Sequence, residues 1–249
     1  MFGQILLHLT VLALVLYESQ LDHAPLCSHE TMVASTPGLT SESDTAEAFV
    51  LEPEESYIDD SKIGRPGKNR LEIQRFVRVK NTIIVIRLFS RGRGKEWRLK
   101  QTIKLERPNY PHELELHFKD FNSDGRNDFT FVSAVAARGA NEVRTLFTYD
   151  RNRDELVHIK NSENYPNMVY NKRLDCIDAW LFHGATTIVF LRIDGDRLRE
   201  FASVDTGLEE VITVIGKDGR EKVVRREKMK EGDIYTRHIN FDPPEPYNF

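Results

Sequence analysis

The chain has 249 residues, which is enough for one large domain or two smaller ones with an ample core. Apolar residues make up 40% and charged residues 30% of the sequence, the proportions of an ordinary globular protein. The net charge is −4 and no basic stripe with interleaved aromatic residues occurs, so the sequence argues against nucleic-acid binding.

The chain begins with a signal-like segment, residues 1–17, in which an apolar run extends from Ile5 to Tyr17. The run is too short to span a bilayer comfortably and has the length of a signal-peptide core. Basic residues before it and an Ala-x-Ala cleavage site after it are missing, so an uncleaved anchor or a misassigned start remains an alternative. We predict export to the periplasm or the medium, without a stable membrane span.

Residues 18–67 are rich in Ser, Thr, Glu, Asp and Pro and show no sustained periodicity. Between Glu42 and Asp60 there are eight acidic residues and no basic one. Such a stretch buries too little apolar surface to offset the entropy lost on ordering. We therefore predict a flexible acidic tether, with room for a short strand at 48–51.

Residues 68–249 are predicted to be all-β, because apolar and β-branched runs alternate with turn signals. Asp-Gly between such runs is a strong hairpin signal, and no segment predicts a helix of ten or more residues. The expected architecture is a series of consecutive antiparallel hairpins in a propeller-like, sandwich or barrel domain. The predicted strand pairs are 77–89 with 97–105, 143–149 with 155–159, 187–193 with 198–204, and 210–215 with 222–226.

The most chemically specific stretch is Asp-Phe-Asn-Ser-Asp-Gly-Arg-Asn-Asp at residues 120–128. Its spacing is that of the first part of an EF-hand-type calcium loop, in which alternate oxygen ligands are followed by a glycine. Gly125 stands where the loop turns sharply with positive φ. We predict one Ca²⁺ bound by the side chains of Asp120, Asn122, Asp124 and Asp128 and by the main-chain carbonyl of Arg126.

This loop is not predicted to be an EF-hand switch, because Phe131 occupies the position of the closing Glu. The residues from 128 onward and those at 114–118 both indicate strands, so the loop joins two strands. In this it resembles the calcium loops of FG-GAP and VCBS propeller repeats. The alternative is an Asp/Asn/Gly-rich turn without an ion.

Other candidate sites are weaker. Asp150, Asn152 and Asp154 repeat the alternate-oxygen spacing, but no glycine follows, so a plain hairpin turn is favoured. Cys176 is expected to be a free buried thiol, and the neighbouring Asp175 would raise its pKa, which disfavours a nucleophile. No nucleophile elbow, phosphate loop or zinc pattern occurs, so we predict that the protein is not an enzyme; clustered carboxylates remain an alternative.

A basic patch surrounds a Gly-rich turn at residues 90–98. Short charge runs usually face water at a hairpin tip. The functional alternative is a docking edge for an acidic partner. The patch consists of Arg91, Arg93, Lys95 and Arg98.

The order of these elements resembles a group of bacterial periplasmic calcium-loop β proteins. That family includes the immunity protein for a peptidoglycan hydrolase delivered by a type IV secretion system. The counterparts are Asp120 to Val132, Phe147 to Val157, Tyr165 to Asn167, and Phe190 to Leu198.

The resemblance implies a non-enzymatic inhibitor or immunity protein that binds a lysozyme-like peptidoglycan hydrolase. Several such inhibitors insert a Ser-Gly-x-Tyr loop into the enzyme, and the segment from Ser133 to Glu142 lacks that pattern. Because this segment leaves the calcium-pinned strand, we still expect partner contacts there, at Ser133, Arg138, Gly139 and Glu142. The alternative function is a VCBS/FG-GAP-like surface module that binds glycan or protein.

Overall fold

A computed structural model describes residues 52–108, 112–229 and 235–247. The predicted signal-like segment, the short strand at 48–51 and most of the predicted tether lie outside these residues. In the part of the chain that is described, no helix is long and apolar enough to cross a membrane.

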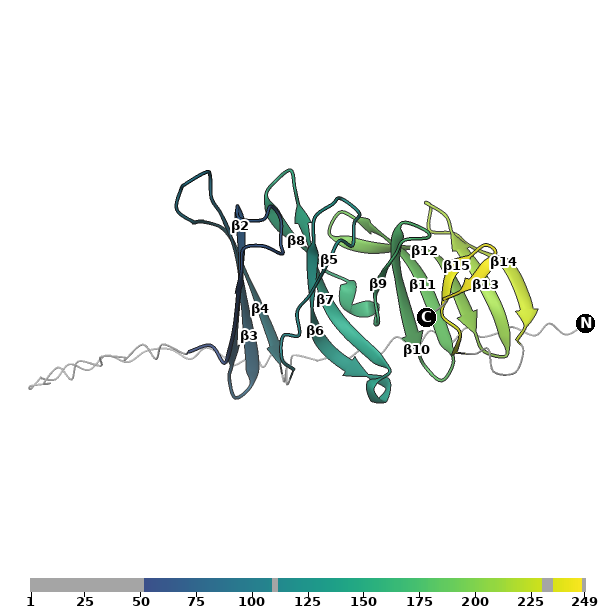
Figure 1. Cartoon of the computed structure of the whole chain (residues 1–249). Coiled ribbons are helices and arrows are strands. Elements are labelled where there is room, and N and C mark those ends of the chain that lie inside the picture. The colour runs from purple at the N-terminus through teal and green to yellow at the C-terminus, as the bar shows by residue number, and fades with distance from the viewer. Residues whose placement is uncertain (1–51, 109–111, 230–234, 248–249) are drawn as a thin grey trace, which may run out of the picture. The chain divides into compact units, whose positions relative to one another are not determined.

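The described residues form an all-β fold of open antiparallel sheets, as predicted (Figure 1). In each of the three larger sheets every strand pairs with the strands adjacent to it in sequence. The first sheet contains β1 (Glu55–Asp59), β2 (Asn69–Val77), β3 (Asn81–Ser90) and β4 (Arg98–Pro108). The second contains β5 (His117–Lys119), β6 (Asp128–Ala136), β7 (Asn141–Asp150) and β8 (Glu155–Ile159).

The third sheet has six strands, and a two-stranded hairpin follows it. The third sheet contains β9 (Val169–Asn171), β10 (Cys176–Phe182), β11 (Thr186–Asp194), β12 (Arg197–Thr206), β13 (Glu209–Ile215) and β14 (Glu221–Lys228). The hairpin contains β15 (His238–Phe241) and β16 (Pro244–Pro246). Two single-turn 3₁₀ segments, η1 (Ala137–Gly139) and η2 (Ser162–Asn164), complete the described elements. None of these sheets closes into a barrel.

The predicted tether is wrong at its carboxyl end, because β1 lies inside it. β1 pairs with β2 in a register from Glu55 opposite Arg75 to Asp59 opposite Leu71. Arg75 of β2 lies 3.1 Å from the Glu55 carboxylate. Its positive charge offsets part of the acidic charge from which disorder was predicted. The connection after β1 is also held in the domain, since Ile63 is fully buried. The ordered domain therefore includes residues 55–67.

The predicted first hairpin also needs correction. The apolar run at 77–89 is not one strand, because β2 ends at Val77 and β3 begins at Asn81. β2 itself, Asn69–Val77, was not predicted as a separate strand. Its mixed sequence alternates buried and half-buried side chains from Asn69 to Gln74 because one face covers the core.

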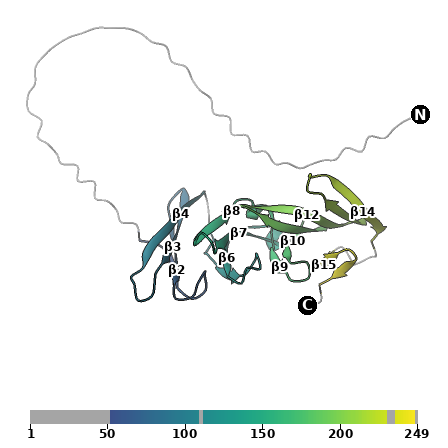
Figure 2. The ribbon, with the colours of Figure 1, turned by 90° about the horizontal axis from the view of Figure 1, so that it is seen from above.

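Two apolar cores hold the sheets together. One contains Ile73 and Ile86 of the first sheet with Phe131 of the second. The other joins Leu146 of the second sheet to Val189 of the third. The second sheet thus lies between the other two, as Figure 2 shows, and both of its faces are covered. This explains why β7 is buried continuously from residue 144 to 149 rather than at alternate positions.

Candidate functional site

The candidate calcium loop joins β5 to β6, so it lies between two strands as predicted, but the first of them spans His117–Lys119 rather than residues 114–118. The Phe121 side chain is buried in the core between the second and third sheets. On the other side, the Asn127 amide donates to the Lys62 carbonyl at 2.9 Å, which ties the loop to the β1–β2 connection. The loop therefore contacts parts of all three sheets.

Hydrogen bonds from its own main chain shape the loop. The two carboxylate oxygens of Asp120 accept from the amides of Asp124 (3.1 Å) and Gly125 (2.8 Å). Asn122 Oδ1 also accepts from the Asp124 amide, at 3.1 Å, and Asp124 Oδ1 accepts from the Arg126 amide at 2.8 Å. Gly125 has φ of 80°, the left-handed conformation that the sequence predicted for it.

Asp128 is the first residue of β6 and its side chain is fully buried. Its two oxygens accept from the amides of Phe121 (2.8 Å) and Tyr149 (2.9 Å). Burial raises the pKa of this carboxyl to about 7, and the nearby negative charges of Asp124 and Asp120 contribute in the same direction. Within the described residues Asp128 has no ion-pair partner. A buried acid beside two others is an arrangement that a cation would stabilise.

The structure does not gather these acids into a coordination shell. Among the described residues, no group of three or more His, Cys, Asp or Glu side chains is placed to hold a metal ion. Instead, oxygens of Asp120, Asn122 and Asp124 accept hydrogen bonds from loop amides. The Arg126 guanidinium is directed to the Gly64 carbonyl, 3.5 Å away. The calcium ligands remain a prediction that the loop conformation and the buried Asp128 fit.

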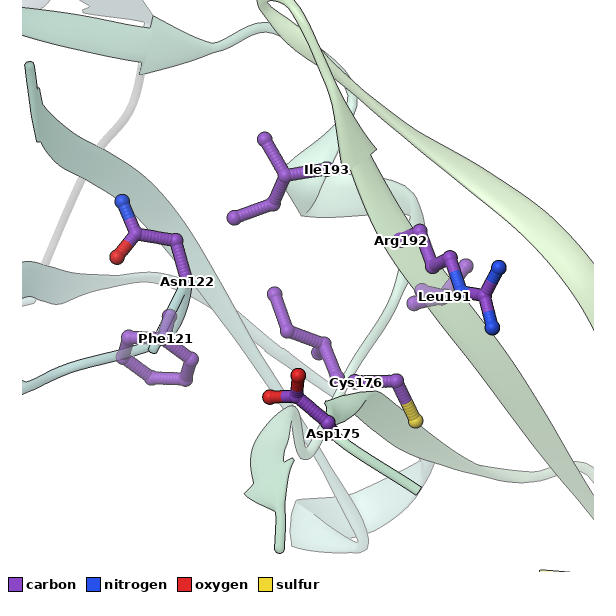
Figure 3. A pocket seen from close by; sticks show the side chains of 8 residues that line it. Phe121, Asn122, Asp175, Cys176, Leu191, Arg192 and Ile193 are labelled. Atoms are coloured by element: carbon purple, nitrogen blue, oxygen red, sulfur yellow. The ribbon is translucent and has the colours of Figure 1, made fainter. Parts of the chain in front are cut away.

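A hollow of about 280 Å³ lies between this loop and the third sheet (Figure 3). Phe121 and Asn122 line one side of it, and Asp175, Cys176 and Ile193 belong to the other. Cys176 is a free, buried thiol, as predicted. Burial, followed by the charge of the nearby Asp178, raises its pKa to about 12, so the thiolate nucleophile is not accessible at neutral pH.

The predicted partner-contact residues lie on the β6–β7 hairpin but not at one place. Arg138 and Gly139 are exposed at its tip. Ser133 and Glu142 lie in the half-buried stem, where Ser133 Oγ is 2.9 Å from Thr145 Oγ1 and Glu142 pairs with Arg144 at 2.6 Å. Of the four predicted residues, two are exposed at the tip, and the two in the stem already have hydrogen-bond or ion-pair partners.

The tip has an unusual backbone. Ala137, Arg138 and Gly139 have φ of 48°, 55° and 98°, so three successive residues are left-handed. For residues other than glycine this conformation is strained, and such strain is often found at functional sites. The Ala-rich sequence gave no sign of it.

Sequence reasoning also missed the polar network that fixes the stem. Thr145 donates to Glu163 at 2.6 Å, and Glu163 is held by two hydrogen bonds from the Arg107 guanidinium of β4. The buried Arg144 donates to Thr130 at 2.9 Å and to the Glu115 carbonyl. These residues are far apart in sequence, so no local pattern marks them.

No protein-family model and no curated protein matches the chain. One solved structure, named as a Xanthomonas type IV secretion system related protein, is similar to it at 12% sequence identity. The alignment covers 70% of this chain and 95% of that chain, with a TM-score of 0.43.

Proposed function

We propose that this protein is a non-enzymatic binding protein that contacts a protein partner through the tip of the β6–β7 hairpin. The observation that carries the proposal is the run of left-handed residues at 137–139 on an exposed tip with a rigidly bonded stem. A strained tip on a fixed stem presents one conformation, which lowers the entropy lost on binding.

The chemistry of the tip supports an enzyme cleft as the binding surface. Ala136 and Ala137 have small side chains and Gly139 has none, so the tip is narrow, and Arg138 carries a positive charge at its end. Glycoside hydrolases place paired carboxylates on either side of the scissile bond. A guanidinium forms strong two-point hydrogen bonds with a carboxylate. Together with the sequence resemblance, this supports a lysozyme-like peptidoglycan hydrolase as the partner, with the protein acting as its inhibitor or immunity protein.

We further propose that one Ca²⁺ stabilises the hairpin. The side chains of Asp120, Asn122, Asp124 and Asp128 and the carbonyl of Arg126 would hold it. When bound, the ion would supply the positive charge that the buried Asp128 lacks among the described residues. Because Asp128 begins β6, the loop and the hairpin share a strand, and rigidity at one end of it supports the other. The high calcium of an extracellular compartment suits such a site, which agrees with the proposed export to the periplasm or medium.

The test measures inhibition of a panel of lysozyme-type muramidases in the presence of calcium. We expect at least one enzyme to be inhibited, and Arg138→Glu to weaken that inhibition by about tenfold or more, since it places a carboxylate against carboxylates. The matched control is Arg151→Glu, the same change at an exposed arginine beyond the opposite end of β7.

If no muramidase is inhibited or captured from envelope extract, the hydrolase assignment is wrong. Robust hits on a glycan array would then favour the alternative VCBS-like surface module. Equal losses with Arg138→Glu and Arg151→Glu would remove the tip from the binding site while leaving inhibition itself in place.

A further inference from the structure

A strongly basic hollow lies at one end of the first sheet. Its lining residues include none from the calcium loop or the hairpin tip. The β1–β2 connection contributes Arg65 and Lys68, the β3–β4 connection contributes residues 91–93, 95 and 96, and β4 contributes Arg98 and Lys100. The hollow has a volume of about 430 Å³. A second hollow of about 560 Å³ adjoins it and shares Lys68, Arg91 and Lys95.

Charge in this hollow is unbalanced. Seven of the eleven residues that line it are Lys or Arg, against the two acids Glu96 and Asp154. The whole chain has a net charge of −4, so this concentration of positive charge is opposite in sign to the rest of the molecule. Like charges placed together in a concave surface attract anions, because they focus the field there.

Asp154 offsets only the charge of Arg65, and its carboxylate already has four partners. It accepts from Asn69 (2.6 Å), Ser90 (2.7 Å) and Tyr149 (2.6 Å) and pairs with Arg65 at 3.1 Å. Although burial acts to raise the pKa of Asp154, these hydrogen bonds outweigh it and hold the pKa below its ordinary value.

The Arg91 guanidinium also has partners within the protein. Its Nε donates to the Gly67 carbonyl at 3.0 Å and its guanidinium lies 3.8 Å from Asp60. The same guanidinium is 4.2 Å from the centre of the Trp97 ring, with Arg70 at 5.0 Å from that ring. These contacts hold the Arg91 side chain in place on one side of the hollow.

Five cations that line the hollow remain without an ion pair to any described residue. They are exposed, and two loops and the start of β4 bring them to the same surface. These residues are Lys68, Arg93, Lys95, Arg98 and Lys100.

We propose that this hollow binds a ligand with several phosphate groups. Apart from Gly92, every lining residue is polar or charged, so the hollow lacks the aromatic or aliphatic anchor on which protein docking depends. A terminal phosphate group carries up to about two negative charges and an internal one about one, and arginine and lysine both bind them well. Three phosphates in series therefore come close to balancing the five unpaired cations. The phosphates have two possible sources, a soluble polyphosphate or the headgroups of a lipid surface.

The experiment titrates the full chain with inorganic tripolyphosphate by calorimetry at low salt, with citrate as a multivalent carboxylate for comparison. We expect tripolyphosphate to bind, to bind more tightly than citrate, and to weaken as salt rises. The double variant Arg93→Gln with Lys95→Gln should reduce the affinity by about tenfold or more. Both residues are exposed, so folding is expected to be unaffected.

The matched control is Lys217→Gln with Arg220→Gln, which removes the same charge from the exposed β13–β14 turn. Equal losses in the two double variants, or no tripolyphosphate binding, would overturn the proposal. Preference for citrate or for an acidic peptide would overturn the phosphate assignment.

Co-sedimentation with vesicles then separates the two sources. Binding to vesicles that contain an anionic phospholipid, but not to purely zwitterionic ones, assigns the hollow to a lipid surface. Tripolyphosphate binding without vesicle binding assigns it to a soluble ligand. Neither result depends on muramidase inhibition.

Discussion

Two turns of this protein contain the same alternation of oxygen-bearing residues, but the last acid of each turn lies in different surroundings. The loop at 120–128 contains Asp-x-Asn-x-Asp, and so does the turn at 150–154. In the second turn, Asp150 accepts hydrogen bonds from the amides of Asn152 (2.8 Å) and Arg153 (3.1 Å). These two bonds close the turn between β7 and β8.

The difference between the two lies in what surrounds the last acid. Asp154 finds hydrogen-bond donors and the guanidinium of Arg65 within the protein, and its pKa is lowered despite burial. Asp128 finds two amides and two like charges, and burial raises its pKa. One acid has a counter-charge from the protein, whereas the other has none among the described residues. Four predictions use this contrast, from the largest expected effect to the smallest.

The largest effect is expected from Asp154→Asn. This substitution tolerates the left-handed backbone at this position (φ of 58°) but removes the charge from a network of three donors and Arg65. We expect the free energy of unfolding to fall by about 2–3 kcal/mol, the effect of breaking a largely buried charged network. Chemical denaturation measures it, with Asp150→Asn in the same turn as the control, for which the loss should be under about 1 kcal/mol. Equal losses would show that the turn, and not its partners, matters.

Calcium is expected to stabilise the protein through the first loop only. At a hundredfold excess over the dissociation constant, the gain is about 2.7 kcal/mol by binding linkage. Adding a chelator should therefore lower the melting temperature, and Asp124→Ala should remove most of that difference. Melting that does not change on chelation of a calcium-loaded sample would contradict the proposed site. Asp154→Asn provides the contrast, because it should leave the calcium-dependent shift intact.

The stability that Asp154 contributes should also depend on pH. For Asp154 the folded pKa lies below the unfolded value, so its contribution is present above the unfolded pKa and is lost as pH falls through the folded pKa. Below pH of about 4 the stability of the wild type should therefore approach that of Asp154→Asn. Denaturation curves at several pH values measure this. A constant gap between the two proteins down to the lowest pH would contradict the charged network.

The smallest effect is expected at Gly125, which has φ of 80° and nothing near the position of an added Cβ. Gly125→Ala should therefore lower stability by about 1 kcal/mol through backbone strain alone. It should also weaken calcium binding, because the loop has to turn at this residue. Gly94→Ala is the matched control, since Gly94 has φ of 62° and is equally free of contacts. A similar stability loss with no change in calcium affinity is expected there.

Local signals predicted much of the secondary structure. The hairpins β7–β8, β11–β12 and β13–β14 were predicted from turn residues between apolar runs. Such hairpins depend on residues adjacent in sequence, which is why they can be predicted. β1 was missed because its acidic sequence indicates disorder, and Arg75 of β2, twenty residues from Glu55, offsets that charge. The left-handed tip at 137–139 was missed because alanine gives no signal for it.

The sequence by itself determined the all-β class, the spacing of the oxygen ligands in the 120–128 loop and the need for glycine at 125. Each of these is a property of neighbouring residues and of the backbone angles that they allow. Only the tertiary structure decided the counter-charges of the acids and the hollow formed by the basic side chains. Asn69 and Asp154, for example, are 85 residues apart and meet only when the first two sheets pack together. Charge balance is a property of what surrounds a group in space, and packing sets those surroundings.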